Sequence, residues 1–217
     1  MKRCGRLIEL VGPAGAGKST IARLLGERDP ALRIAPGLWG LPRAPLRLAT
    51  ARLLPRLLGF YRTFPRPVWQ EIKQIIRLDT LYRVTTRNGA TAVLDEGPVL
   101  ALGWFDVYGD AGVRRSAFAS WRDHAIAQWG QALDIVVLLD ASDDVLVSRI
   151  RGRDKRHDMK HRSDEEIGMF VRRYRAALTN AIADLRRVNG LVVWRVDTST
   201  EAPAASAARV LEALHGN

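Results

Sequence analysis

The sequence predicts an α/β fold in which a parallel sheet is covered by helices on both faces. Three observations support this prediction. Short apolar segments alternate along the chain with longer segments of helical spacing. The apolar segments are continuously hydrophobic, which is typical of parallel strands that are buried on both sides. A glycine-rich turn joins the first apolar segment to the first helical one.

Length and composition set the frame for this fold. The chain has 217 residues, of which 47% are hydrophobic and 26% charged, and its formal net charge is +11. This size suits a single domain over residues 1–217. No apolar run approaches the ~20 residues of a membrane helix, and the first ten residues lack a signal-peptide pattern. Cys4 is the only cysteine, which fits the reducing cytoplasm.

The N-terminal part of the chain begins with a strand, a turn and a helix. Residues 7–11 are a short apolar run that ends at a glycine, as expected of a buried strand. Apolar residues recur on one face over 19–27, which predicts a helix. Residues 32–35 form a second, short strand. A helical piece over 46–58 follows, bounded or kinked by its two prolines.

The middle of the chain holds a long helix, a strand and another helix. Isoleucines along one side of residues 68–87 predict the long helix, and the pair Asn88-Gly89 terminates it. Residues 91–94 read as a buried strand that leads into an acidic turn. Large apolar residues at helical spacing predict a helix over 114–129.

The C-terminal part continues the alternation. Residues 134–139 are the most apolar run of the chain and predict a strand, which a helix over 142–151 follows. A capping-box pattern begins the strongly amphipathic helix predicted over 163–187. A fifth strand over 191–196 and a final helix over 203–214 complete the chain.

Residues 12–19, GPAGAGKS, match the phosphate-loop pattern G-x-x-x-x-G-K-[ST] in full. The glycines let backbone N–H groups curl inward towards phosphate oxygens, and the positive end of the following helix adds to the attraction. Lys18 is expected to place its charge on the β- and γ-phosphates, and Ser19 to ligate Mg²⁺. The residues predicted to hold the nucleotide here are Gly12, Pro13, Ala14, Gly15, Ala16, Gly17, Lys18, Ser19 and Thr20.

With this loop in an alternating chain, the sequence resembles the P-loop kinases of the adenylate kinase, thymidylate kinase and nucleoside kinase group. The resemblance implies a five-stranded parallel sheet in the order 2-3-1-4-5 and the use of ATP and Mg²⁺. It also implies a carboxylate at the end of the third strand, an arginine-rich lid over 149–163, and an acceptor-binding helical region over 36–90.

Asp95 and Glu96 close the third predicted strand. Ligands of open α/β sheets bind beyond the carboxyl ends of the strands, so these acids are expected at the site. One carboxylate would hold Mg²⁺ and the other would accept a proton from the acceptor. We assign Asp95 to the metal and Glu96 to the base, although the two are interchangeable. By resemblance they occupy the acidic position of a D-R or E-R motif, but Gly97 and Pro98 stand where the arginine is expected.

Several arginines lie in the predicted lid. Arg149 and Arg153 share a helix face if the helix continues, and Arg151 and Arg156 are close by. Arginine forks match phosphate oxygens and stabilise the charge that spreads during phosphoryl transfer. In the kinases that this segment resembles, the first arginine reaches the nucleotide phosphates or stacks on adenine. The same resemblance places Thr198, after the fifth strand, near the adenine.

Residues 36–90 are expected to recognise the acceptor. Their arginines suit an anionic acceptor, and their aromatic residues suit an apolar wall. Arg77 and Asp79 interrupt an otherwise apolar helix face, so we expect both to contact the acceptor. Trp104 would either stack on an acceptor ring or pack in the core, and both roles stay open. The basic run over 43–66 also suits an anionic membrane surface.

Together these features predict a cytoplasmic kinase that uses ATP and Mg²⁺ to phosphorylate a small molecule, such as a nucleoside or nucleotide. The residues predicted to act in catalysis are Lys18, Asp95, Glu96, Arg149 and Arg153. Two alternatives stay open. The charge of +11 suggests a polynucleotide 5′-hydroxyl kinase, although nucleic acid is not the favoured partner. The other alternative is an NTP-binding regulatory module without an acceptor. A homodimer also stays open.

Overall fold

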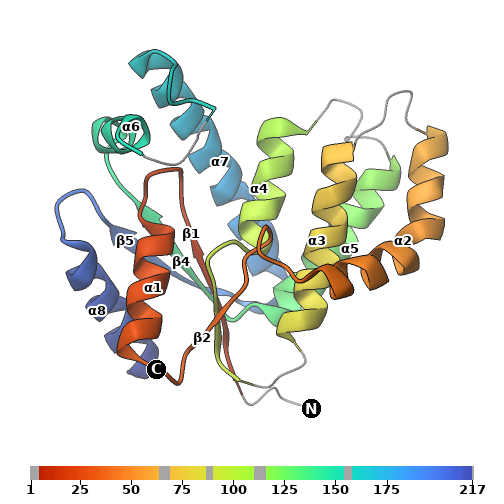
Figure 1. Ribbon diagram of the computed structural model, residues 1–217, viewed down its shortest axis with the longest axis horizontal. Coiled ribbons are helices and arrows are strands. Elements are labelled where there is room, and N and C mark those ends of the chain that lie inside the picture. Colours follow the sequence, from red (N-terminus) through yellow and green to blue (C-terminus); the bar gives the residue numbers. More distant parts are fainter. Residues whose placement is uncertain (1–4, 64–68, 87–89, 110–115, 154–157, 217) are drawn as a thin grey trace.

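Five parallel strands form one sheet at the centre of the molecule, in the order β2-β3-β1-β4-β5 (Figure 1). The computed structural model describes residues 5–63, 69–86, 90–109, 116–153 and 158–216. The strands are β1 (Leu7–Val11), β2 (Arg33–Ala35), β3 (Ala92–Leu94), β4 (Ile135–Asp140) and β5 (Val192–Asp197). Their parallel pairing and their order confirm the predicted fold class.

Helices cover both faces of the sheet, because successive strand residues point to opposite sides. In chain order they are α1 (Lys18–Arg28), α2 (Arg43–Thr63), α3 (Trp69–Thr85), α4 (Pro98–Tyr108), α5 (Ser116–Ala132), α6 (Asp143–Arg151), α7 (Asp164–Asn189) and α8 (Pro203–His215). Helices α1, α6 and α8 pack on the face that contains Ile8 and Leu10 of β1. Helices α3, α4, α5 and most of α7 pack on the face that contains Leu7 and Val11.

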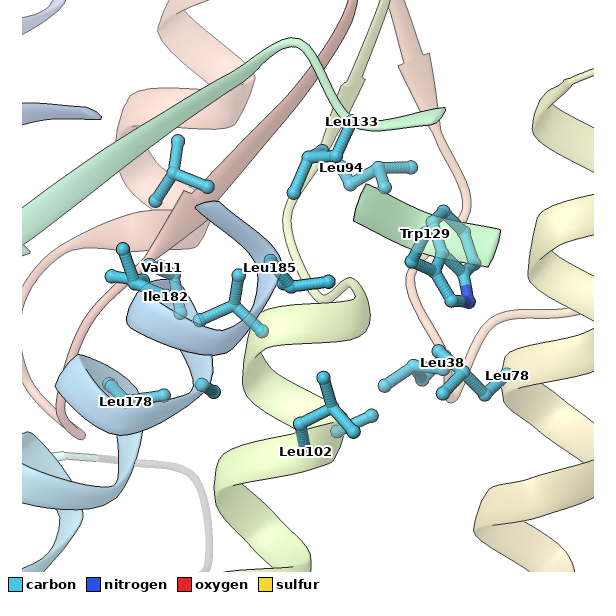
Figure 2. Packing of buried hydrophobic residues seen from close by; sticks show 14 of the residues in the cluster. Val11, Leu38, Leu78, Leu94, Leu102, Trp129, Leu133, Leu178, Ile182 and Leu185 are labelled. Atoms are coloured by element: carbon cyan, nitrogen blue, oxygen red, sulfur yellow. The ribbon is translucent and has the colours of Figure 1, made fainter. Parts of the chain in front are cut away.

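The core on the second face fixes the helices that later form part of the site. Figure 2 shows that Leu102 of α4 and Leu178 of α7 belong to one apolar cluster, in which Trp129 of α5 lies close to Leu38 and Leu78. The Trp129 side chain is almost fully buried, and its ring meets that of Tyr82 edge-on. Large interlocked side chains of this kind hold α3, α4 and α7 in defined positions on the sheet.

Helix α2 is longer than the sequence predicts. A helical piece was expected over 46–58, whereas α2 spans Arg43–Thr63. Pro45 falls in the first turn, where a missing N–H leaves no bond unmade. Pro55 lies inside the helix, and the ribbon of α2 bends along its length in Figure 1. The second proline therefore kinks the helix without ending it.

Helix α4 is absent from the predicted elements. It begins with Pro98 directly after Gly97, an arrangement that favours a helix start. Its residues are apolar almost all round, because the helix is buried between the sheet and neighbouring helices. A helix of this kind shows no amphipathic period, so the pattern that reveals the other helices does not reveal this one.

The other helices lie within a few residues of their predicted positions. The capping box at the start of α7 is confirmed, since Ser163 Oγ accepts from the Glu166 N–H and Glu166 Oε2 accepts from the Ser163 N–H. Gly190 ends α7 with a left-handed φ of 56°. Among the helices that the structure describes, none combines the length and apolar character needed to span a membrane.

Candidate active site

A cavity of about 1070 Å³ opens at the carboxyl ends of the strands. One side is formed by the phosphate loop and the start of α1, with Arg149, Thr198 and the start of α8 beside them. The other side is formed by α3, α4 and α7. The position agrees with the rule that α/β sheets bind ligands at this edge. The cavity is large enough for two small molecules side by side.

The phosphate loop adopts the curled conformation that its glycines allow. Gly15 and Gly17 have φ values of 86° and 90°, in the left-handed region that other residues rarely adopt. Gly12 lies against β4, and a Cβ built there would be 2.1 Å from the carbonyl oxygen of Leu139. The loop ends where Lys18 begins α1, so the free N–H groups of that helix point into the cavity.

Lys18 is held over the loop by two carbonyl groups. Its Nζ donates to the oxygens of Gly12 and Pro13 at 2.8 and 3.0 Å. Burial lowers the pKa of Lys18 to about 8; the negative charge of Asp95 opposes this shift and the positive charge of Arg153 adds to it. The charges of Asp95 and Arg153 therefore lie close enough to Lys18 to act on its amine.

Asp95 and Glu96 follow β3 and face the phosphate loop from across the sheet edge. Oδ1 of Asp95 is buried and makes no hydrogen bond to any described residue. Glu96 lines the cavity, and its carbonyl oxygen accepts from the Leu38 N–H at 3.3 Å. Gly37 gives the Glu96 side chain room, because a Cβ there would lie 3.0 Å from Oε2. The two acids therefore occupy different surroundings.

The donor set suits a hard divalent cation that is held mainly by phosphate oxygens. The buried Oδ1 of Asp95, without a partner among the described residues, is the kind of ligand that such a cation takes. The charge of Asp95 acts on Lys18, and Ser19, the next residue after Lys18, lines the cavity. Over the described part of the chain, no three His, Cys, Asp or Glu side chains gather into a metal cluster. A site with so few protein ligands fits Mg²⁺ bound together with a nucleotide.

Arg149 joins two parts of the nucleotide side. Its guanidinium donates to the carbonyl oxygen of Gly15 at 3.3 Å, to Thr198 Oγ1 at 3.1 Å and to the Thr198 carbonyl at 2.6 Å. Thr198 is buried and donates in turn to the Asp140 carbonyl. The arginine thus ties the phosphate loop to the turn after β5, while both residues still line the cavity.

The other lid arginines do not form one helical row. Helix α6 ends at Arg151, so the condition under which Arg149 and Arg153 would share a helix face is not met. Arg153 nevertheless lines the cavity. Arg151 points elsewhere, because its Nε pairs with Asp164 at 2.5 Å. Arg156 lies outside the described residues.

The acceptor side of the cavity is a chamber walled by aromatic and polar side chains. We call this part the acceptor chamber. Trp104 lies in it, as predicted, and its ring contacts those of Phe105 and Tyr108. The residues that line the chamber are Leu38, Trp39, Gln70, Glu71, Gln74, Glu96, Leu100, Ala101, Trp104, Tyr108, Phe170 and Tyr174.

Arg77 and Asp79 were expected to contact the acceptor, but neither residue lines the chamber. The Arg77 guanidinium stacks on the Trp39 ring at 4.0 Å, and Trp39 lines the chamber whereas Arg77 does not. Asp79 pairs with Arg83 one helical turn later at 2.8 Å and lines a separate cavity of about 360 Å³ between α2, α3 and α5. The helix spacing that made Asp79 stand out serves an ion pair instead.

The arginines at the start of the basic run do not grip the chamber either. Arg43, Arg47 and Arg52 are exposed on α2, and none of them lines the larger cavity. The side chains from residue 56 to residue 68 lie outside the described part of the chain. The described residues therefore give no support to an anionic acceptor held by this run.

Two polar residues of the site escaped the sequence analysis. Gln74 is 2% exposed, lines the chamber, and has a buried Oε1 without a partner among the described residues. Glu9 is fully buried inside β1. The sequence does mark both residues as unusual, because each is polar at a position where a buried strand or helix face is expected to be apolar. Neither could be assigned before α4, which passes close to both, was known.

The fold is shared with solved kinase structures at low sequence identity. Deoxyadenosine kinase from M. mycoides, with the products dCMP and dCDP, is 18% identical with a TM-score of 0.57, covering 97% of this chain and 98% of that one. Shikimate kinase from Bacteroides thetaiotaomicron is 14% identical with a TM-score of 0.54 and covers 97% and 98%. Shikimate kinase from Acinetobacter baumannii, in complex with shikimate, is 17% identical with a TM-score of 0.50 and covers 99% and 96%.

Sequence comparison identifies the family. No curated protein sequence matches the chain. A family model described as an AAA domain, however, matches residues 7–177, which span the phosphate loop, both acids, the lid and the chamber helices. With its complete phosphate loop and its kinase-like sheet, the chain belongs to this AAA domain family of P-loop proteins.

Proposed function

We propose that the protein is an ATP- and Mg²⁺-dependent phosphotransferase that moves the γ-phosphoryl group to a hydroxyl group of a small molecule. One observation carries this proposal. A single cavity joins the phosphate loop, the Glu96 carboxylate, two arginines and a chamber with aromatic walls, and the charge of Asp95 acts on Lys18 of the loop. A plain nucleotide switch needs no second chamber beside its phosphate site, whereas a transferase needs room for an acceptor.

The donor half would bind the triphosphate. Backbone N–H groups of the loop and Lys18 would hold the β- and γ-phosphates, with Arg153 adding charge from the lid side. Ser19 and Asp95 would hold Mg²⁺, which when bound neutralises charge on the phosphate oxygens. Thr198 and Arg149 border the region where the adenine ring of the nucleotide would lie.

Glu96 would act as the base, because it lines the chamber while the buried oxygen of Asp95 suits the metal. In the transfer step the acceptor oxygen forms a bond to the γ-phosphorus, and the bond from that phosphorus to the bridging oxygen breaks, so that ADP leaves. Glu96 takes the proton that the acceptor hydroxyl loses. Closing the lid residues over the group would exclude water and suppress hydrolysis.

The chamber favours an acceptor with a ring or another apolar body. Trp39, Trp104, Tyr108, Phe170 and Tyr174 give it five aromatic side chains. The Gln74 amide oxygen requires an N–H or O–H donor from the ligand. A nucleoside or a similar ring-bearing alcohol meets both requirements. The fold itself accommodates different acceptors, since the solved neighbours include kinases named for deoxyadenosine and for shikimate. We place the reaction in the cytoplasm, where ATP is abundant.

The test is a screen for acceptor-dependent ADP release across nucleosides, nucleotides, other hydroxylated metabolites and a 5′-hydroxyl oligonucleotide. Lys18→Ala should lower the rate with the best acceptor by about 100-fold or more, because it removes a charge that stabilises the transferred group. Lys73→Ala, on the exposed side of α3, is the matched control and should keep the wild-type rate. Equal rates for Lys18→Ala and wild type, or no saturable binding of ATP by the wild type, would refute the proposal.

A further inference from the structure

Glu9 is a charged residue in the middle of the central strand. The other residues of β1 are apolar, and Glu9 is 0% exposed. Isolating a carboxylate from water in this way is costly unless hydrogen bonds compensate for the lost solvation. The position of Glu9 therefore has to be explained by its partners.

The partners of Glu9 are the free N–H groups at the start of α4. Its Oε1 accepts from the N–H groups of Gly97 and Leu100, each at 3.1 Å, and its Oε2 accepts from the Val99 N–H at 2.9 Å. The remaining residue of this turn, Pro98, has no N–H to satisfy. The Ala101 N–H bonds back to the Gly97 carbonyl. One carboxylate thus satisfies every free donor of the first turn, which normally requires a capping residue of the helix itself.

The contact depends on a close approach of the two segments. A Cβ built on Gly97 would lie 2.7 Å from Cδ of Glu9, so a side chain at this position would push the carboxylate away. Burial raises the pKa of Glu9 to about 7, while the three N–H bonds and the positive end of the α4 dipole favour the ionised form.

Glu9 connects the two halves of the candidate active site. It lies three residues before Gly12, at the start of the phosphate loop, and opposite Leu94 in the register of β1 and β3. Asp95 and Glu96 occupy the short turn between Leu94 and the N–H groups that Glu9 holds. Further along, α4 carries Leu100, Ala101, Trp104 and Tyr108 into the chamber wall.

We propose that Glu9 is a positioning residue, which fixes the Asp95-Glu96 turn and the chamber wall of α4 relative to the phosphate loop. This inference rests on the proposed phosphotransferase function. Glu9 touches neither nucleotide nor acceptor, so its effect reaches the reaction through the turn. Loss of its contacts shifts the acids and the acceptor relative to the γ-phosphate, while the loop itself keeps its conformation.

The test compares Glu9→Gln with wild type. Glutamine keeps the shape of the side chain but places an NH₂ group against N–H donors of α4. We expect kcat for acceptor-dependent ADP release to fall about 10- to 100-fold and the KM for the acceptor to rise, as small misplacements of reacting groups produce. The Kd of ATP without Mg²⁺ should stay within about twofold of wild type, because it reports on the loop alone. Unchanged kcat and KM would overturn the inference.

Val137→Ala is the control for a merely structural effect. Val137 is buried in β4 on the opposite face of the sheet, away from α4, and its truncation lowers stability without touching the turn. It should leave kcat close to the wild-type value at a temperature where the protein is folded. If Glu9→Gln and Val137→Ala lower the melting temperature and kcat to the same extent, Glu9 has no positioning role.

Amide hydrogen exchange provides a readout that does not depend on turnover. In Glu9→Gln the amides of Gly97, Val99 and Leu100 should exchange faster than in wild type, while those of the phosphate loop should not change. If the wild type shows no acceptor-dependent ADP release, the proposed function fails, and this exchange pattern alone decides whether Glu9 holds the turn. Unchanged exchange at these amides would overturn the contact itself.

Discussion

Lys18 is held by two carbonyl groups of its own loop. Its Nζ donates to the carbonyl oxygens of Gly12 and Pro13, and burial lowers its pKa to about 8. A bound triphosphate would replace these carbonyls and bring several negative charges close to the amine. Negative charge favours the ammonium form, so nucleotide binding should raise the pKa of Lys18 again.

The first prediction at the scale of the residue concerns this titration. Lys18 is charged below its pKa of about 8 and neutral above it, so the affinity for ATP should fall as the pH rises from about 7 to about 9.5. Binding above pH 8 should take up a proton, which calorimetry in two buffers of different ionisation enthalpy detects. Lys18→Met should bind weakly and lose this proton uptake. A wild-type affinity that is constant over this range would contradict the assignment.

Residues whose role is local could be predicted, and residues whose role depends on distant elements could not. The phosphate loop is specified by eight consecutive residues, and the structure gives it the expected curl. Asp79 shows the opposite case. Its isolation on an apolar face suggested a ligand contact, but the ion pair with Arg83 accounts for it. Gln74 acquires a role only through Trp104 and Tyr108, which come from another helix.

The start of α7 shows how much one cap contributes at the scale of the element. Ser163 and Glu166 satisfy each other's backbone N–H groups, and the helix that they begin is the longest of the described helices. The helix begins directly after residues 149–163, the segment that the sequence predicts to be a lid. A helix of this length depends on its ends less than a short one does, but the free donors still have to be satisfied.

The prediction at this scale is a modest loss of stability. Ser163→Ala removes the cap and should lower the free energy of unfolding by about 1 kcal/mol. Denaturant unfolding should show a lower midpoint with an unchanged slope. Ser142→Ala is the matched control, because Ser142 is also an N-cap but its side chain makes no capping hydrogen bond. Equal losses for the two variants would show that the capping box contributes nothing.

Helices with one apolar face could be predicted from the helical spacing of their apolar residues. Helices that are apolar all round, or that contain a proline, could not be predicted correctly in this way. Helices α1, α3, α5, α6, α7 and α8 were found close to their true limits. Helix α4 was missed because it is buried all round, and this omission hid a wall of the chamber. Helix α2 extends beyond the predicted 46–58 at both ends, and the structure accommodates Pro55 as a kink, which is one of the two outcomes that the sequence left open.

At the scale of the whole molecule, the sheet separates the two halves of the proposed reaction. The helices α1, α6 and α8 lie on the face that borders the nucleotide side, and α3, α4 and most of α7 lie on the face that borders the chamber. The strand order was available from the resemblance to P-loop kinases. The chamber was not, because its residues come from segments that are far apart in the chain and meet only in three dimensions.

The prediction at this scale is stabilisation of the fold by nucleotide. Ligand at about 100 times its Kd adds about 2.7 kcal/mol to the free energy of unfolding. For a protein of this size the melting temperature should therefore rise by about 5 to 10 °C with ATP and Mg²⁺. Differential scanning calorimetry measures this rise, which Lys18→Ala should largely abolish. A rise of the same size in Lys18→Ala would place nucleotide binding elsewhere.

The clamp that Arg149 forms between Gly15 and Thr198 has a consequence for how such a protein diversifies. Under the proposed function, this clamp joins two segments of the nucleotide side without using any residue of α3 or α4. Substitutions on the chamber side of those two helices would then change which alcohol is accepted while ATP remains the phosphoryl donor. A new substrate preference would require only new side chains on one wall of the chamber.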